Sequence, residues 1–184
     1  MTFRPSHHDD RCIRVEGPHP ATLDTDTLLK QCRIEFGRVA GPGGQNRNKV
    51  ETAVMIAHLP TGVETHATER RSQGQNRSMA IFRLRLKLAI KVRTWVNRDH
   101  HQPSELWRQR RQGEKMSVNP QHEHYPALLA EALDLVVARG YDVAGAAGRL
   151  GITMSQLARL IRHEKHAFAL VNEGREARGL PRLK

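Results

Sequence analysis

With 184 residues and a formal net charge of +11, the chain is long enough to bury a core without disulfides or metals, and its basic balance favours a polyanionic partner. Its two cysteines are too few for a disulfide framework, which excludes a disulfide-stapled secreted scaffold and suggests free thiols in a reducing cytosol. The polar N-terminus lacks the apolar run of a signal peptide, and no segment is apolar enough to span a membrane. We therefore expect a cytoplasmic protein with no membrane partner.

The N-terminal part of the chain begins with a flexible arm. Residues 1–22 are polar and contain three prolines, a composition typical of a poorly ordered segment. Residues 23–29 predict a short helical turn. Residues 32–38 then alternate small or apolar with polar side chains, which predicts a strand whose Ile34 and Phe36 face inward.

A glycine-rich loop is the most distinctive part of the sequence: residues 41–54 read GPGGQNRNKVETAV. Gly43 and Gly44 free the backbone to adopt angles that other residues rarely take, and Pro42 stiffens the approach to them. The loop can therefore approach another molecule closely, with Gln45 at its tip. A neutral amide can position a reacting group but is no strong general base, so a catalytic role here would need machinery supplied by a partner. The triplet alone is equally consistent with a surface turn.

A hairpin and a long helix follow the loop. Residues 53–56 and 63–67 predict two strands joined by a turn that contains Pro and Gly. Ser72 and Gln75 have the spacing of a capping box, and the apolar residues after them recur at helical spacing to about Val96. The expected unit is α+β: a small mixed sheet, connected β-loop-β-β-α, with one long helix packed on it.

The positive charge is concentrated behind the glycine loop. Residues 70–115 hold thirteen Lys or Arg and three Asp or Glu, a net of +10, whereas residues 119–184 hold nine and seven, a net of +2. A charge run can simply be a solvated face. Here the fourfold spacing of Arg83, Lys87 and Lys91 aligns three cations along one side of a helix, which favours contact with nucleic acid.

The last third of the chain predicts a separate helical module. Residues 99–125 are basic and polar without periodicity and indicate a linker. Within residues 126–184, Asp142 and Thr153 are helix caps, and two short helices joined across residues 150–153 resemble a helix-turn-helix. A docking or stabilising role for this module and a nucleic-acid role both remain open.

One family shares the order and spacing of many of these residues. The positions that carry the match are Gly41-Pro42-Gly43-Gly44-Gln45, Asn48-Lys49, Thr52-Ala53-Val54, His58-Leu59-Pro60-Thr61-Gly62-Val63, Arg71-Ser72-Gln73, Asn76-Arg77, Ala80 and Leu84-Arg85. In these positions the chain resembles the catalytic domain of the class I peptide-chain release factors and the small codon-independent peptidyl-tRNA hydrolases that rescue stalled ribosomes. The resemblance implies that residues 23–98 form such a domain.

The resemblance also implies a reaction, in which water hydrolyses the ester between a nascent peptide and tRNA in the ribosomal peptidyl-transferase centre. The main chain at Gln45 would stabilise the developing oxyanion, and its side chain would admit water and exclude bulkier nucleophiles. Gly43 and Gly44 would let the loop thread into the centre. Ribosomal RNA would position the substrate, so the implied partners are the ribosome and peptidyl-tRNA, with no cofactor, no metal and a monomer off the ribosome.

Charge and resemblance together give a set of expected RNA or ribosome contacts. Some motif positions in this set are expected to brace the glycine loop instead, and the sequence does not separate the two roles. His58 resembles a structural position of the family, and Ser72 is expected to cap a helix rather than to act as a nucleophile. The set is Arg47, Asn48, Lys49, Arg71, Gln73, Asn76, Arg77, Arg83, Lys87, Lys91, Arg108, Arg110 and Arg111.

The chain also departs from the family pattern. Asn46-Arg47 stands where the family most often has His-Val, and the chain has no room for a codon-reading domain. Arg108, Arg110 and Arg111 are a sparse counterpart of the long basic tail of the rescue hydrolases. These departures leave two alternatives beside a rescue hydrolase: a non-catalytic RNA- or ribosome-binding protein with the same fold, and a DNA-binding regulator that uses the C-terminal helices.

Overall fold

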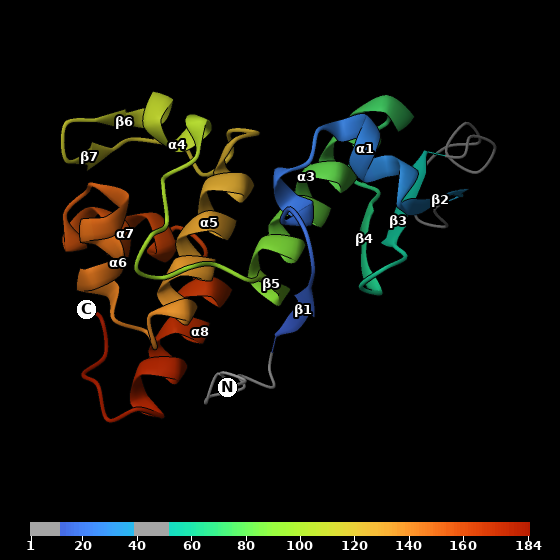
Figure 1. Cartoon of the computed structure of the whole chain (residues 1–184). Helices are drawn as coiled ribbons and strands as arrows, with labels where there is room; N and C mark the ends of the chain where they lie inside the picture. Colours follow the sequence, from blue (N-terminus) through green and yellow to red (C-terminus); the bar gives the residue numbers. More distant parts are fainter. Residues whose placement is uncertain (1–11, 39–51) are drawn as a thin grey trace.

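The chain folds into an α+β molecule, as the sequence predicts, and the computed structural model describes residues 12–38 and 52–184 (Figure 1). A β-loop-β-β-α unit is followed by a group of helices. In chain order the elements are β1 (Ile13–Val15), the 3-10 helix η1 (Pro20–Thr22), α1 (Thr25–Lys30), β2 (Cys32–Gly37), β3 (Ala53–His58), β4 (Val63–Ala67), α3 (Gln73–Lys91), β5 (Val92–Thr94), α4 (Glu105–Arg110), β6 (Arg111–Gln112), β7 (Lys115–Met116), α5 (Tyr125–Ala138), α6 (Val143–Leu150), α7 (Met154–Arg162) and α8 (Lys165–Glu176).

The main sheet, expected to be mixed, is antiparallel throughout and has the order β2-β3-β4. Parallel pairing occurs in a separate two-stranded sheet formed by β1 and β5. Helix α3 packs on β3 and β4 and buries Val54, Ile56 and Leu84. Strand β2 lies at the sheet edge. Phe36 lies on the inner face with its partner Val54, as predicted, but at this edge its side chain remains 46% exposed.

Helix α3 ends at Lys91, five residues before the predicted end. Val92 leaves the helix with extended backbone, and residues 92–94 pair in parallel with residues 13–15. This pairing also corrects the expectation that residues 1–22 form a poorly ordered arm, because the part from residue 13 to 22 contains β1 and η1. Residues 1–11 of that arm lie outside the described residues.

The segment 99–125, expected as a linker, contains α4 and the β6-β7 hairpin. Trp107 of α4 is fully buried, and its indole Nε1 donates a hydrogen bond to the Leu150 carbonyl at 2.9 Å. The backbone N–H of Thr153 donates to the Glu114 carbonyl at 3.2 Å, which fixes the hairpin to the start of α7. This segment is therefore packed structure that holds the C-terminal helices in place.

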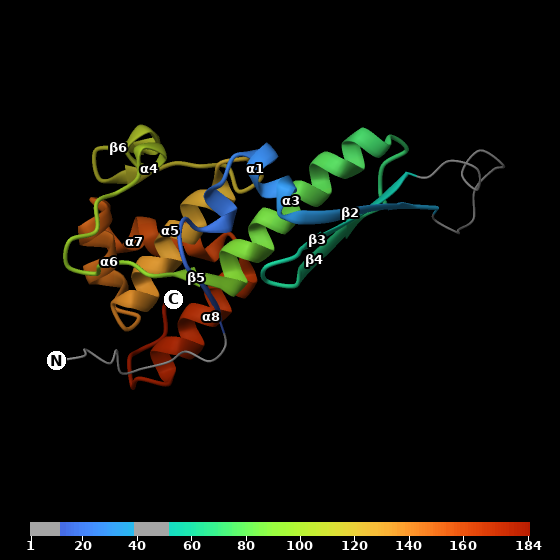
Figure 2. The same cartoon turned by 45° about the vertical axis from the view of Figure 1, so that its right-hand side comes forward.

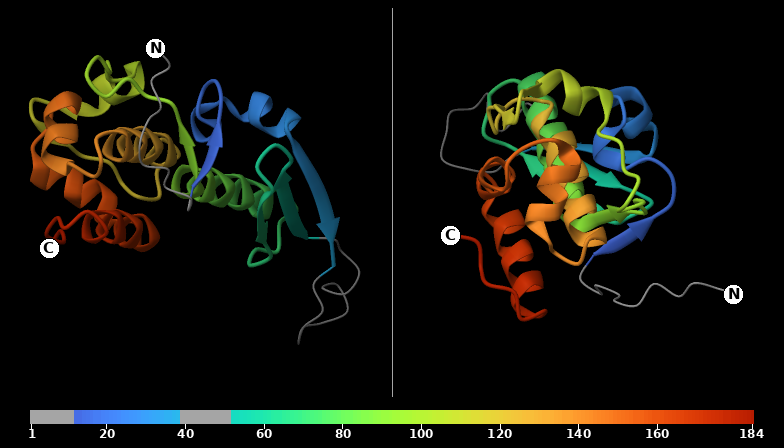
Figure 3. Two further views of the ribbon diagram at one scale, coloured as in Figure 1. Left: turned by 60° about the horizontal axis from the view of Figure 1, so that its bottom comes forward. Right: turned by 60° about the vertical axis from the view of Figure 1, so that its left-hand side comes forward.

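The C-terminal helices share a hydrophobic core with the β-loop-β-β-α unit and do not form a separately packed module. Helix α5 contacts α3, and buried side chains from both helices belong to one continuous hydrophobic core. Gly151, with φ of 70°, ends α6, and the Thr153 side chain caps α7, as expected for a helix-turn-helix. Figure 2 and the left view of Figure 3 show the sheet at one end of the molecule and α6 and α7 at the other, with α3 and α5 between them. No helix in the described ranges is long and apolar enough to cross a membrane.

Candidate functional site

The glycine loop connects β2 and β3 at the end of the sheet where their pairing stops. The last pair of this ladder joins Gly37 to Ala53. Gly43, Gly44 and Gln45, together with Arg47, Asn48 and Lys49, fall on residues 39–51, outside the described residues. The base of the loop consists of the described residues on its two sides, Gly37 and Arg38 before it and Thr52 and Ala53 after it.

Asn76 holds the base of the connection in place. Its side chain is fully buried, and its Nδ2 donates hydrogen bonds to the carbonyls of Thr52 (2.7 Å) and Arg70 (2.9 Å). Its Oδ1 accepts from the backbone N–H of Arg70 at 2.9 Å. One amide therefore joins the first turn of α3, the segment before it and the residue that precedes β3. Of the two roles left open for Asn76, the structure supports bracing, because a buried side chain with all of these bonds made has no surface to offer RNA.

Helix α3 begins at the same end of the sheet. Ser72 caps it by accepting a hydrogen bond from the backbone N–H of Gln75 at 3.4 Å. Arg71, Gln73 and Arg77 are exposed around this cap. Because Asn76 ties the first turn of α3 to Thr52, these exposed side chains lie close to the base of the glycine loop. They place two guanidinium groups near Thr52, at the base of the loop.

Two of the three cations on the predicted stripe bond to the edge strand β4. The Arg83 guanidinium donates to the His66 carbonyl and Lys87 Nζ donates to the Glu64 carbonyl, each at 2.9 Å. Both bonds satisfy outward-facing carbonyls and place charge on an edge strand, which protects the edge from pairing with another chain. Arg83 and Lys87 thus have a structural role that the spacing did not reveal, whereas Lys91 is exposed in the last turn of α3.

Arg83 also makes an ion pair with Glu69 at 2.7 Å. Its hydrogen bond to that carboxylate lowers the pKa of Glu69 to about 2. The pair keeps the end of β4 close to α3. Arg83 is therefore partly neutralised before any RNA approaches.

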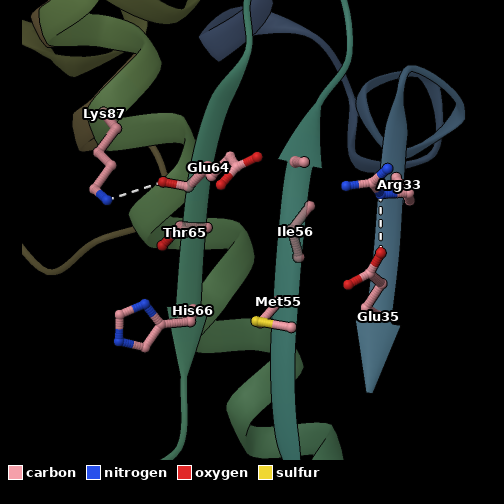
Figure 4. A pocket seen from close by; sticks show the side chains of 9 residues that line it. Arg33, Glu35, Met55, Ile56, Glu64, Thr65, His66 and Lys87 are labelled. Carbon is pink, nitrogen blue, oxygen red and sulfur yellow. Dashed lines mark hydrogen bonds and ion pairs between the residues drawn. The ribbon is translucent and has the colours of Figure 1, made fainter. Parts of the chain in front are cut away.

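The sheet face opposite α3 carries a hollow of about 290 Å³ (Figure 4). Arg33 and Glu35, both on β2, form an ion pair along one side of it at 3.0 Å, and Met55 on the central strand β3 is 47% exposed. The hollow presents both signs of charge. It lacks the uniformly positive lining that a phosphate site needs.

The remaining predicted contacts lie in and after α4. Arg108 pairs with Glu105 at 2.8 Å, Arg110 bonds to the imidazole nitrogens of His122 and His124, and Arg111 donates to the Gly151 carbonyl at 3.0 Å. The Arg108 pair lies within α4, whereas Arg110 joins α4 to the segment before α5 and Arg111 joins the hairpin to the end of α6. The structure does not bring these three arginines close to the first turn of α3, which lies at the same end of the sheet as the base of the loop.

His58 has the structural role that the sequence suggested. It is 1% exposed, and its two ring nitrogens contact Thr61 Oγ1 at 2.7 Å and Gln31 Oε1 at 3.0 Å. Burial lowers the pKa of its imidazole. The side chain thus links the end of β3, the β3-β4 turn and the segment before β2.

A buried polar cluster behind the sheet was not expected from the sequence. Arg93 and Asp134 approach to 3.5 Å with side chains only 2% and 3% exposed, and Asp134 also accepts from the Thr94 hydroxyl at 2.5 Å. His19 bonds to the Val92 carbonyl at 3.1 Å, and burial lowers its pKa. The cluster joins β5, α5 and η1. It positions the C-terminal helices rather than a substrate.

Comparison with known proteins places this architecture in a family. Residues 23–125, more than half of the chain, match the RF-1 domain. The chain belongs to the RF-1 domain family. The matched range includes α4 and the β6-β7 hairpin, so these elements are part of the RF-1 match rather than a connection after it.

The relatives of this RF-1 domain are much longer proteins. The chain is 56% identical over 57 residues to the chloroplastic peptide chain release factor PrfB1 of Arabidopsis thaliana, which covers 31% of this chain and 12% of that protein. It is 45% identical over 71 residues to peptide chain release factor 1 of Chlorobaculum tepidum, covering 39% and 20%. It is 43% identical over 67 residues to peptide chain release factor 2 of Paramagnetospirillum magneticum, covering 36% and 18%. The chain thus spans at most a fifth of the length of these three proteins.

Proposed function

We propose that this protein is a cytoplasmic hydrolase that cleaves the ester of peptidyl-tRNA on stalled ribosomes without reading a codon. The observation that carries the proposal is the Gly43-Gly44-Gln45 triplet, located in an RF-1 domain between strands β2 and β3. Similarity to peptide chain release factors supports the reaction class. The codon-independent part of the proposal rests on the resemblance to the small codon-independent peptidyl-tRNA hydrolases at the motif positions given above.

The proposed mechanism divides the work between the loop and the ribosome. The backbone N–H at Gln45 stabilises the oxyanion that forms as water attacks the ester carbonyl; removing one such donor costs about 3–4 kcal/mol in well-studied enzymes. The Gln45 amide orients the water and leaves no room for a larger nucleophile. Ribosomal RNA holds the substrate and excludes bulk water, so no nucleophile-base pair is needed on the protein.

The structure supports a rigid mounting for this loop. Asn76 fixes the base through bonds to Thr52 and Arg70, and the exposed Arg71 and Arg77 place positive charge beside it. A tip that must reach a reacting centre within about half an ångström needs such a support. The guanidinium groups then contact ribosomal RNA around the loop.

The test is peptide release from two purified ribosome complexes. One carries peptidyl-tRNA on an mRNA truncated after the last sense codon, and the other carries a stop codon in the A site of an intact mRNA. We expect release from the truncated complex at a rate that does not depend on the last codon. Release that requires a stop codon in the A site would contradict the codon-independent part of the proposal.

A non-catalytic ribosome-binding role is the second candidate. It is favoured by Asn46-Arg47, which stands where the family most often has His-Val beside the triplet. Co-sedimentation with ribosomes without release of peptide from either complex would support this alternative and contradict hydrolysis.

A further inference from the structure

A second positively charged site lies far from the glycine loop, between the β6-β7 hairpin and α7. Here a groove of about 200 Å³ is lined by hydrogen-bond donors and by no carboxylate. Its polar lining comes from Lys115 and Ser117 on one side and, on the other, from Gln156 and Arg159 of α7 and from His163 directly after this helix. Figure 1 shows the hairpin lying over α6 and α7.

The groove is built on a rigid frame. Met116 and Leu160 form its apolar floor and are 6% and 3% exposed. The Thr153 cap and the bond from its N–H to the Glu114 carbonyl hold the hairpin against the start of α7. Helix α7 contains no acidic residue, and its buried face leaves Arg159 on the outside. The donors are thus fixed in place by elements that pack in the core.

The cations of the groove differ from their neighbours in having no internal partner. Arg108, Arg110 and Arg111 are each engaged by a carboxylate, an imidazole or a carbonyl. The side chains of Lys115 and Arg159 donate no hydrogen bond to any group within residues 12–38 and 52–184. Two unneutralised cations facing one polar groove are suited to an external anion.

The charge distribution indicates which anion this is. Residues 119–184 have a net charge of only +2, too little to supply the many phosphate contacts that hold a protein on duplex DNA alone. A groove with two cations is instead suited to a supplementary contact on the polyanion that the proposed function assigns to the exposed cations of residues 70–115. Lys115 itself is the last cation of that +10 segment.

We propose that the groove between β7 and α7 binds the phosphate backbone of ribosomal RNA, with Lys115 and Arg159 contacting phosphate oxygens. The choice of RNA rests on the proposed function. The helical module then gives the protein a second hold on the ribosome, at the opposite end of the molecule from the catalytic loop.

The experiment measures binding of the full chain to a fluorescein-labelled RNA hairpin by fluorescence anisotropy over a range of salt. The test variant is Lys115→Ala/Arg159→Ala. The matched control is Lys165→Ala/Arg182→Ala, which removes the same charge from exposed positions outside the groove. We expect the test variant to bind on the order of tenfold more weakly than the control, with a salt slope lower by about 1.8, because each phosphate contact contributes about 0.9.

Equal affinity of the two variants would overturn the proposal, as would an undiminished salt slope. Equal or tighter binding of a DNA duplex of the same sequence, lost in the test variant, would assign the groove to DNA and overturn the choice of RNA. The charge-retaining variant Lys115→Arg/Arg159→Lys should bind like the wild type. This measurement does not depend on hydrolysis, so a protein that releases no peptide would refute the proposed function and leave this result standing.

Discussion

At the scale of single residues, Asn76 shows what sequence patterns can and cannot predict. The pattern marked Asn76 as a motif position but did not separate an RNA contact from a brace. Burial decides the matter, because a fully buried amide with three bonds to backbone groups is part of the support for the loop. The catalytic role of the Gly43-Gly44-Gln45 triplet stays a prediction, because these residues lie outside the described residues. The support below the loop, which we call the Asn76 clamp, consists of the bonds from Asn76 to Thr52 and Arg70. These residues are 24 and 6 positions away in the sequence, so no local pattern predicts the bonds.

Replacing Asn76 should therefore weaken the fold and the loop support together. Asn76→Ala leaves the Thr52 carbonyl and the Arg70 backbone groups without their partner, and we expect the free energy of unfolding to fall by about 2–3 kcal/mol. Urea unfolding followed by circular dichroism measures this. Gln75→Ala, at the exposed neighbouring position, is the control and should change stability by less than about 0.5 kcal/mol. Equal effects at the two positions would contradict the clamp.

His19 gives the fold a dependence on pH. Burial lowers its pKa in the folded chain below the ordinary value of 6.5, with Asp134 and Arg93 facing it. Above pH 6.5 the imidazole is neutral in both the folded and the unfolded chain. Below that pH the unfolded chain takes up a proton that the folded chain resists, so stability falls as the pH is lowered. Urea unfolding at pH 7.5 and 5.5 should show a smaller loss in His19→Gln than in the wild type; identical losses would contradict this account.

At the scale of elements, local patterns predicted where elements begin better than where they end. The Ser72 cap fixes the start of α3, but its apolar spacing continues past Lys91 to Trp95. The helix stops because residues 92–94 pair with β1, about 80 positions earlier in the chain, and no local pattern contains that pairing. Helix α4 and the β6-β7 hairpin were missed for a similar reason. Six helical residues and two-residue strands are too short for a recognisable period, and their packing depends on Leu150.

The two tryptophans test the correction to segment 99–125. Trp107 is fully buried and bonded to the Leu150 carbonyl, whereas Trp95 is 80% exposed. We expect Trp107→Ala to lower the free energy of unfolding by about 3–5 kcal/mol. Trp95→Ala removes the same side chain from the surface and should cost less than about 0.5 kcal/mol. Comparable losses in the two variants, measured by urea unfolding, would show that the segment is the loosely packed linker that the sequence suggested.

At the scale of the whole molecule, the first unit and the C-terminal helices share one core. Helix α5 packs on α3, and the buried Arg93–Asp134 pair joins β5 to α5. The boundaries at residues 98 and 125 that the sequence suggested mark changes in composition. They do not separate two cores, because buried side chains of α3 and of the C-terminal helices belong to one hydrophobic cluster. The helical module could be predicted from its caps and apolar spacing. Its docking on α3 could not, because the two helices are separated by more than thirty positions.

A shared core predicts that the first unit does not fold alone. A chain ending at residue 98 exposes the face of α3 that α5 covers and leaves Arg93 without Asp134. We expect this fragment to lose the cooperative thermal transition of the full chain, as measured by far-ultraviolet circular dichroism at the helix band. A sharp transition with native-like signal in the fragment would mean that residues 12–98 are an independent domain.

The central claim is hydrolysis at the glycine tip, and single-turnover release of peptide from ribosomes on truncated mRNA tests it most directly. We predict that Gln45→Ala lowers the release rate on the order of a hundredfold, the effect of a misplaced reacting group. Its binding to the same ribosomes, measured by co-sedimentation, should match the wild type. Release at the wild-type rate by Gln45→Ala and also by Gly44→Ala would contradict the account.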